Sequence, residues 1–177
     1  MTAARTAPFE VIPLDAPLGA EVRGLDASQP LSPETVTALS EAWDRYLVLM
    51  MRRQRLSDDQ LLVFSRCFGE LDPPGPNPYG ELFLPDYPEI NVISNVVENG
   101  RHLGNLGDGE AVWHADMTYI DVPPRAGILH SLEIPVGQGD TYFADMSAAY
   151  EALADNLKAA VEGKVAIHDS AHNSAGM

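Results

Sequence analysis

The feature that most constrains the fold of this chain is the order of its helical and strand-like segments. Two capped helices come early, and most strand-like runs come late. Ser32 as N-cap, with Pro33 after it, predicts the start of the first helix. Ser57 and Gln60 have the spacing of a capping box and predict the second helix. From Ile90 onward, short apolar runs of strand length are separated by Gly- and Pro-rich turns. Early helices followed by mostly antiparallel strands predict an α+β fold rather than a doubly wound sheet.

Along the sequence, the expected strands come before, between and after these two helices. We expect them at residues 9–14, 19–26, 47–51, 90–94, 111–119, 125–134, 140–145 and 164–169, with a third helix at 147–161. The segment PVGQG, between the strands at 125–134 and 140–145, suits a tight reversal. A chain of 177 residues with no repeat or linker fits one domain, so we expect a single domain over 1–177.

Charge and composition narrow the classes of partner. The formal net charge is −15, and such an acidic surface repels phosphate backbones and anionic lipid. We therefore expect no nucleic acid or membrane partner, a small-molecule substrate instead, and leave a homo-oligomer open. The chain has one cysteine, Cys67, and its start, MTAARTAPFE, lacks the apolar core of a signal peptide. These features favour a cytoplasmic protein.

The stretch WHADMTY places a histidine and an aspartate two residues apart. Side chains at positions i and i+2 of a strand project from the same face, so His114 and Asp116 would lie together. An imidazole and a carboxylate on one face supply two ligands of the two-histidine, one-carboxylate triad that binds non-haem Fe(II). The simpler alternative is a hydrogen-bonded His–Asp pair on a half-buried strand. The motif by itself does not choose between them.

Several further motifs follow in a fixed order after this pair. They are PP, an apolar run, GDT, an aromatic pair and ADMSAAYEAL, all within residues 113–153. This segment resembles the core signature of the taurine dioxygenase family of Fe(II)/2-oxoglutarate-dependent oxygenases. The resemblance extends back through LGAEVRGLDASQPLS, LVLMM and LSDDQLLVFSRCFGEL, and forward to GKVAIHDS. It therefore covers nearly the whole chain.

The resemblance implies a double-stranded β-helix (a jelly-roll, or cupin-like, core) with flanking helices. It also implies an enzyme that uses Fe(II), 2-oxoglutarate and O₂ to hydroxylate a small organic substrate, with release of succinate and CO₂. We expect that substrate to be anionic. By resemblance, His114 and Asp116 are catalytic metal ligands, Thr141 contacts a carboxylate of 2-oxoglutarate, and Met117 lies beside the substrate. Gln138 departs from the family, which usually has glycine there.

Simpler roles exist for these side chains. Thr141 in a strand is commonly just a good β-former, and Met117 on a strand commonly packs in a core. The substrate is also open, because taurine-specific members have an asparagine where this chain has Glu110. Taurine itself is therefore not the expected substrate.

The third iron ligand is not evident. In the resembling family it is a second histidine well over fifty residues beyond the HxD motif, and the arginine that binds 2-oxoglutarate lies further on. Downstream of the motif this sequence offers His168 and His172, besides His130. We expect the chain to be the N-terminal portion of such an oxygenase, with a jelly-roll incomplete at its C-terminus.

Two rival functions remain at this point. A truncated, non-catalytic jelly-roll could bind a partner and keep the HxD motif as a structural pair. A metal-dependent enzyme of the cupin type could work without 2-oxoglutarate. Metal uptake and a response to 2-oxoglutarate separate the three possibilities.

Overall fold

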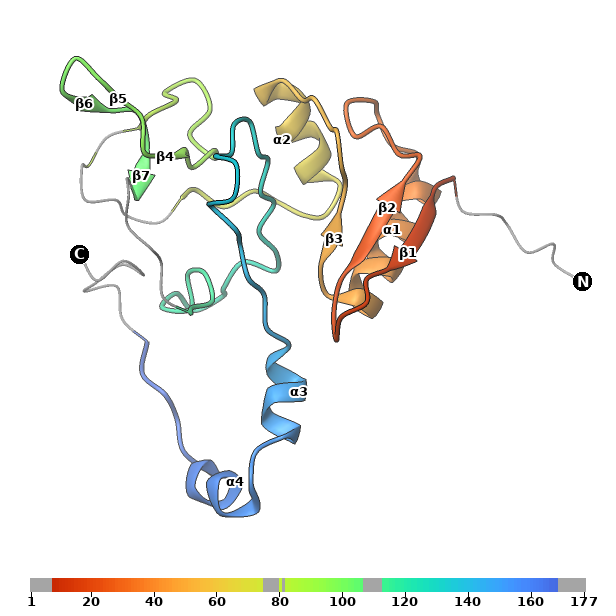
Figure 1. Cartoon of the computed structure of the whole chain (residues 1–177), viewed down its shortest axis with the longest axis vertical. Coiled ribbons are helices and arrows are strands. Elements are labelled where there is room, and N and C mark those ends of the chain that lie inside the picture. The colour runs from red at the N-terminus through yellow and green to blue at the C-terminus, as the bar shows by residue number, and fades with distance from the viewer. Residues whose placement is uncertain (1–7, 75–79, 81, 107–112, 169–177) are drawn as a thin grey trace, which may run out of the picture. The chain divides into compact units, whose positions relative to one another are not determined.

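The computed structural model describes residues 8–74, 80, 82–106 and 113–168 (Figure 1). These residues form two compact units. One comprises the described residues within 1–69 and 130–164, and the other those within 70–129 and 165–177. Each unit is treated by itself below. The single domain expected over 1–177 stays a prediction.

A three-stranded sheet organises the first unit. Its strands are β1 (Glu10–Pro13), β2 (Ala20–Arg23) and β3 (Leu49–Met50), in the order β1-β2-β3. β1 pairs antiparallel to β2, with Val11 opposite Val22, and β3 pairs parallel to β2, with Ala20 opposite Leu49. The first three predicted strands are thereby confirmed. β3 is a short edge strand and is half-buried.

Two helices begin where their caps predict. They are α1 (Pro33–Tyr46) and α2 (Asp58–Arg66). The Ser32 hydroxyl accepts a hydrogen bond from the backbone N–H of Thr35 at 3.2 Å. The Ser57 hydroxyl accepts from the N–H of Gln60 at 3.2 Å, and the Gln60 side chain accepts from the N–H of Ser57 at 2.9 Å. The second pair is the predicted capping box, complete in both directions.

Both helices contribute to one apolar core with the sheet. The buried cluster consists of Phe9, Val22, Ala27, Leu39 and Phe64. Leu39 of α1 is fully buried, and α1 lies along one side of the sheet in Figure 1. The Phe64 ring of α2 meets the Phe68 ring edge to face, with 5.4 Å between centroids. This core is the best-packed part of the described chain.

The second unit contains two small two-stranded sheets. β4 (Ile93–Ser94) pairs parallel to β7 (Asn105–Leu106), and β5 (Val97–Glu98) pairs antiparallel to β6 (Arg101–His102). Asn99 and Gly100 join β5 to β6 with positive φ angles of 52° and 79°, the backbone that an Asn-Gly hairpin turn requires. β4 confirms part of the strand predicted at 90–94.

The later strands predicted from the sequence are wrong. Within the described residues of 111–119, 125–134, 140–145 and 164–169 the backbone forms turns and irregular segments. None of the described residues from 113 to 168 is buried. A strand needs a paired neighbour and a face to bury, and the described residues supply neither there. The mixture of helix and sheet agrees with α+β, but the described residues do not form a jelly-roll.

The helix predicted at 147–161 is also broken in two. α3 (Met146–Glu151) is capped by Asp145, whose carboxylate accepts hydrogen bonds from two backbone N–H groups, and α4 (Asp155–Val161) follows. Neither helix has a buried residue. No described helix has both the length and the apolar character needed to cross a bilayer.

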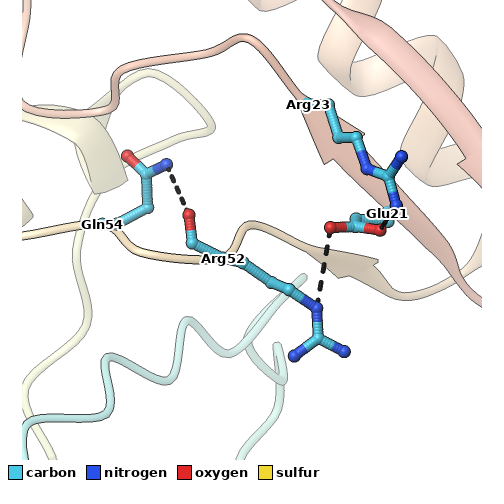
Figure 2. A network of polar contacts seen from close by, with 4 residues as sticks. All are labelled: Glu21, Arg23, Arg52 and Gln54. Atoms are coloured by element: carbon cyan, nitrogen blue, oxygen red, sulfur yellow. Dashed lines mark hydrogen bonds and ion pairs between the residues drawn. The ribbon is translucent and has the colours of Figure 1, made fainter.

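An ion-pair network connects β2 to the segment after β3 (Figure 2). Glu21 accepts a hydrogen bond from Arg23 at 2.6 Å, and Arg52 lies 3.6 Å from the other oxygen of the same carboxylate. Gln54 donates to the carbonyl oxygens of Arg52 and Leu25, at 3.2 and 3.0 Å. A pocket of about 600 Å³ opens at this network. None of the site residues predicted from the sequence lines it.

Replacing Leu39 with alanine tests the core. The Leu39→Ala substitution removes a fully buried side chain and leaves a cavity, so we expect the free energy of unfolding to fall by about 2–5 kcal/mol. Val63→Ala, on the exposed side of α2, should change it by less than about 0.5 kcal/mol. Urea unfolding followed by circular dichroism measures both. Equal effects of the two substitutions would contradict the placement of the core.

The network around Glu21 predicts an acid-side titration. The Arg23 hydrogen bond, opposed by desolvation, holds the pKa of Glu21 below its usual value of 4.5. A lowered folded-state pKa gives stabilisation that is present above the unfolded pKa and lost as the pH falls through the folded pKa. Carbon-detected NMR titration should show the low pKa, and Arg23→Gln should raise it. Arg55→Gln is the control, and a pKa unmoved by Arg23→Gln would contradict the assignment.

Candidate metal-binding site

The segment that carries the HxD motif is a turn rather than a strand. His114 lies in an irregular stretch, and the backbone turns from Asp116 to Tyr119. Met117 has a φ angle of 49°, in the left-handed region that costs a non-glycine residue about 1 kcal/mol. The extended backbone on which the same-face argument depended is therefore absent from this described segment.

The turn nevertheless brings the two motif side chains together. Nε2 of His114 lies 3.1 Å from Oδ1 of Asp116. The side chains are 41% and 73% exposed, so the pair is open to solvent rather than half-buried on a sheet. An exposed ion pair adds little to stability, which weakens the alternative that the pair is purely structural. The predicted proximity holds, although its cause is the turn.

The second carboxylate oxygen of Asp116 faces a glycine. A Cβ added at Gly127 would stand 3.7 Å from Oδ2 of Asp116. Gly127 therefore borders the pair, and a larger side chain there would take up space beside the carboxylate. This position could not be recognised from the sequence, because a single glycine in the run RAGIL carries no distinguishing pattern.

A third polar residue of this unit is held by the same turn. The Thr118 hydroxyl lies 2.8 Å from Nδ1 of His168, within hydrogen-bonding distance. His168 is one of the two alternative third ligands that the sequence suggested. No group of three His, Cys, Asp or Glu side chains in the described residues is placed to hold a metal ion. The structure thus connects His168 to Thr118, and His172 lies outside the described residues.

The remaining predicted site residues are placed as follows. Met117 is half-buried in the turn, directly after Asp116. Thr141 is exposed in the other compact unit, so its predicted contact with 2-oxoglutarate stays a prediction. The turn predicted at PVGQG is present, with a hydrogen bond of 3.3 Å from the N–H of Gln138 to the oxygen of Pro135. Glu110 lies outside the described residues.

The donor set of the pair fits two of the three ligands of an iron site. Two donor atoms each about 2.1 Å from one ion and at right angles to each other lie about 3 Å apart. The Nε2–Oδ1 distance of 3.1 Å is close to that value. An imidazole nitrogen and a carboxylate oxygen are also the donors that non-haem Fe(II) uses. The described residues bring two donors of this kind together, but no group of three that could hold a metal ion.

Comparison with known families identifies the chain. Residues 10–175 match the family described as "Taurine catabolism dioxygenase TauD, TfdA family". The chain belongs to this family. The match includes the HxD turn, Gly127, Thr141 and His168, and it confirms the resemblance found in the sequence.

Individual relatives support the assignment. A pentalenolactone F synthase of Streptomyces arenae is 36% identical over 149 residues, which are 82% of this chain and 48% of that protein. An (S)-phenoxypropionate/alpha-ketoglutarate-dioxygenase of Sphingobium herbicidovorans is 34% identical over 90% of this chain and 53% of its own length. An alpha-ketoglutarate-dependent sulfate ester dioxygenase of Pseudomonas putida is 30% identical over 99% and 54%. The chain spans about half the length of these relatives.

Solved structures give the same result. A taurine dioxygenase from Burkholderia xenovorans superposes with a TM-score of 0.64 at 32% identity, covering 88% of this chain and 51% of that one. The structure of AAD-2 in complex with Mn(II) and N-oxalylglycine superposes with a TM-score of 0.58 at 26% identity, covering 87% and 49%. The fold of the TauD-family chain is thus shared with dioxygenases of this type.

Substitutions at Gly127 test whether space beside Asp116 matters. Gly127→Ala adds a methyl group at ordinary contact distance and should leave divalent-cation affinity unchanged. Gly127→Leu should weaken Mn(II) binding by about tenfold or more, because its longer side chain crowds the carboxylate. Calorimetric titration of the intact protein with Mn(II) measures both. Unchanged affinity in Gly127→Leu would show that this glycine does not border the binding site.

Proposed function

We propose that the intact protein is an Fe(II)/2-oxoglutarate-dependent dioxygenase that hydroxylates a small organic substrate and releases succinate and CO₂. The single observation that carries this proposal is the His114–Asp116 pair, with its 3.1 Å separation, inside a chain of the TauD family. The proposal for the whole protein includes a jelly-roll core, with a second histidine ligand and a 2-oxoglutarate-binding arginine. A cytoplasmic location stays a prediction.

Each predicted residue has a defined task in this proposal. His114 Nε2 and an Asp116 carboxylate oxygen would hold Fe(II) as two of its protein ligands. The bound metal supplies the activation of O₂, while the protein supplies ligands, orientation and exclusion of water. The Thr141 hydroxyl donates a hydrogen bond to a carboxylate of 2-oxoglutarate. Met117 contacts the substrate next to the metal.

The names of the relatives support the co-substrate. Several are alpha-ketoglutarate-dependent dioxygenases, and alpha-ketoglutarate is another name for 2-oxoglutarate. The structural neighbour AAD-2 is in complex with Mn(II) and N-oxalylglycine. N-oxalylglycine has the skeleton of 2-oxoglutarate with one methylene replaced by NH. A divalent metal and a dicarboxylate of this shape are the partners we assign to the present site.

The relatives also favour an anionic substrate. Their names include phenoxypropionate, 2,4-dichlorophenoxyacetate and a sulfate ester, all of which carry a negative charge near neutral pH. A protein with a net charge of −15 repels such a molecule at long range. A divalent cation or an arginine at the site would provide the local attraction that overcomes this repulsion. We therefore propose a small carboxylate or sulfate ester as substrate.

The alternative is a non-catalytic binding protein that kept the HxD motif as a structural pair. This candidate predicts no stoichiometric Fe(II) uptake by the intact protein, and no absorbance band when 2-oxoglutarate is added anaerobically. The dioxygenase proposal predicts both.

Succinate formation by the intact protein tests the proposed reaction. We expect succinate from 2-oxoglutarate only when Fe(II) and O₂ are both present, with faster turnover when a small carboxylate or sulfate ester serves as substrate. His114→Ala and Asp116→Ala should abolish it, because each removes a metal ligand. His130→Ala and Asp121→Ala, which change the same residue types elsewhere, are the matched controls. Full activity in either ligand variant would contradict the assignment.

A further inference from the structure

A hydrogen bond between residues fifty positions apart restrains the turn that carries Asp116. The Thr118 hydroxyl and Nδ1 of His168 are 2.8 Å apart, a normal hydrogen-bond length. Thr118 is half-buried and only two residues from the carboxylate, whereas His168 is exposed at the end of the irregular segment after α4. Both belong to the same compact unit as His114.

The turn has few internal restraints of its own. The backbone hydrogen bond within it, from the N–H of Ile120 to the oxygen of Met117, is long at 3.3 Å. Met117 is in the left-handed region, which is costly for a residue with a side chain. None of the described residues from 113 to 121 is buried in a core, although residues 117–120 are half-buried, so packing restrains the turn only in part. A restraint from outside the turn would therefore have a large effect on where Asp116 points.

We propose that Thr118 and His168 form a positioning pair that orients the Asp116 carboxylate toward His114 for metal binding. This proposal rests on the proposed function of the same site. Hydrogen-bonding partners that orient metal ligands tune metal affinity even though they never touch the ion. The pair acts through the two peptide units between Asp116 and Thr118. In this proposal His168, fifty positions after Thr118, contributes to metal binding by orienting a ligand.

The geometry separates this role from direct ligation by His168. An imidazole engaged at Nδ1 could still bind a metal through Nε2, but the described residues contain no cluster in which His168 joins His114 and Asp116. A hydrogen bond at Nδ1 can be kept by asparagine, whose amide group occupies the place of that side of the imidazole ring. Glutamine places its amide at the Nε2 side instead. The two amides therefore make a matched pair of variants.

Mn(II) affinity of the intact protein, measured by calorimetry, tests the proposal. We expect His168→Ala, His168→Gln and Thr118→Val each to weaken Mn(II) binding about tenfold. His168→Asn and Thr118→Ser should retain the affinity of the unsubstituted protein. The double variant Thr118→Val/His168→Ala should bind as weakly as either single variant, because all three lack the same hydrogen bond.

The outcomes distinguish this proposal from the proposed function. In one outcome the unsubstituted protein binds Mn(II), His114→Ala loses Mn(II) binding, and the Thr118 and His168 variants bind Mn(II) normally. The positioning role is then wrong, and the assignment of the metal site stands. If His168→Asn loses binding as completely as His114→Ala, His168 is a ligand and the positioning role is again overturned. If the unsubstituted protein binds no Mn(II), the proposed function and the positioning role fall together.

Discussion

A β-strand is stable only where a neighbour pairs its backbone and a core receives one of its faces, and this constraint divides the described chain. β2 has a partner on both sides, and residues of α1 and α2 share one buried apolar cluster with it. Residues 113–168 have neither partner strands nor buried side chains among those described, so they form turns, short helices and irregular segments. The candidate metal site lies in that second region, and it must be held by individual polar contacts instead of a sheet.

How far the sequence predicted the structure depends on how local each interaction is. The caps at Ser32 and Ser57 bond to groups three residues away, so their sequence spacing was sufficient to place α1 and α2. The proximity of His114 to Asp116 was also predicted, but for the wrong reason, because i and i+2 side chains meet here across a turn. The contacts of Gly127 with Asp116 and of His168 with Thr118 depend on tertiary structure, which the pattern of a single sequence does not reveal.

The exposure of the pair suits a site that must accept both a metal and a co-substrate. Any His–Asp pair must give up its mutual hydrogen bond to bind an ion, but a buried pair must also find room for that ion, whereas the present pair is open to solvent. The same exposure makes the orientation of the side chains dependent on the backbone beneath them. That dependence links our two proposals. In the first, His114 and Asp116 are metal ligands of a TauD-family oxygenase. In the second, the Thr118–His168 contact keeps the Asp116 carboxylate oriented.

The most direct measurement is the position of a bound metal. Crystals of the intact protein grown with Mn(II) and 2-oxoglutarate, with diffraction recorded at the manganese absorption edge, would locate the ion by its anomalous signal. Our account predicts a peak about 2 Å from both His114 Nε2 and an Asp116 carboxylate oxygen, in place of their mutual hydrogen bond. A peak elsewhere in the protein, with the His114–Asp116 hydrogen bond intact, would contradict it.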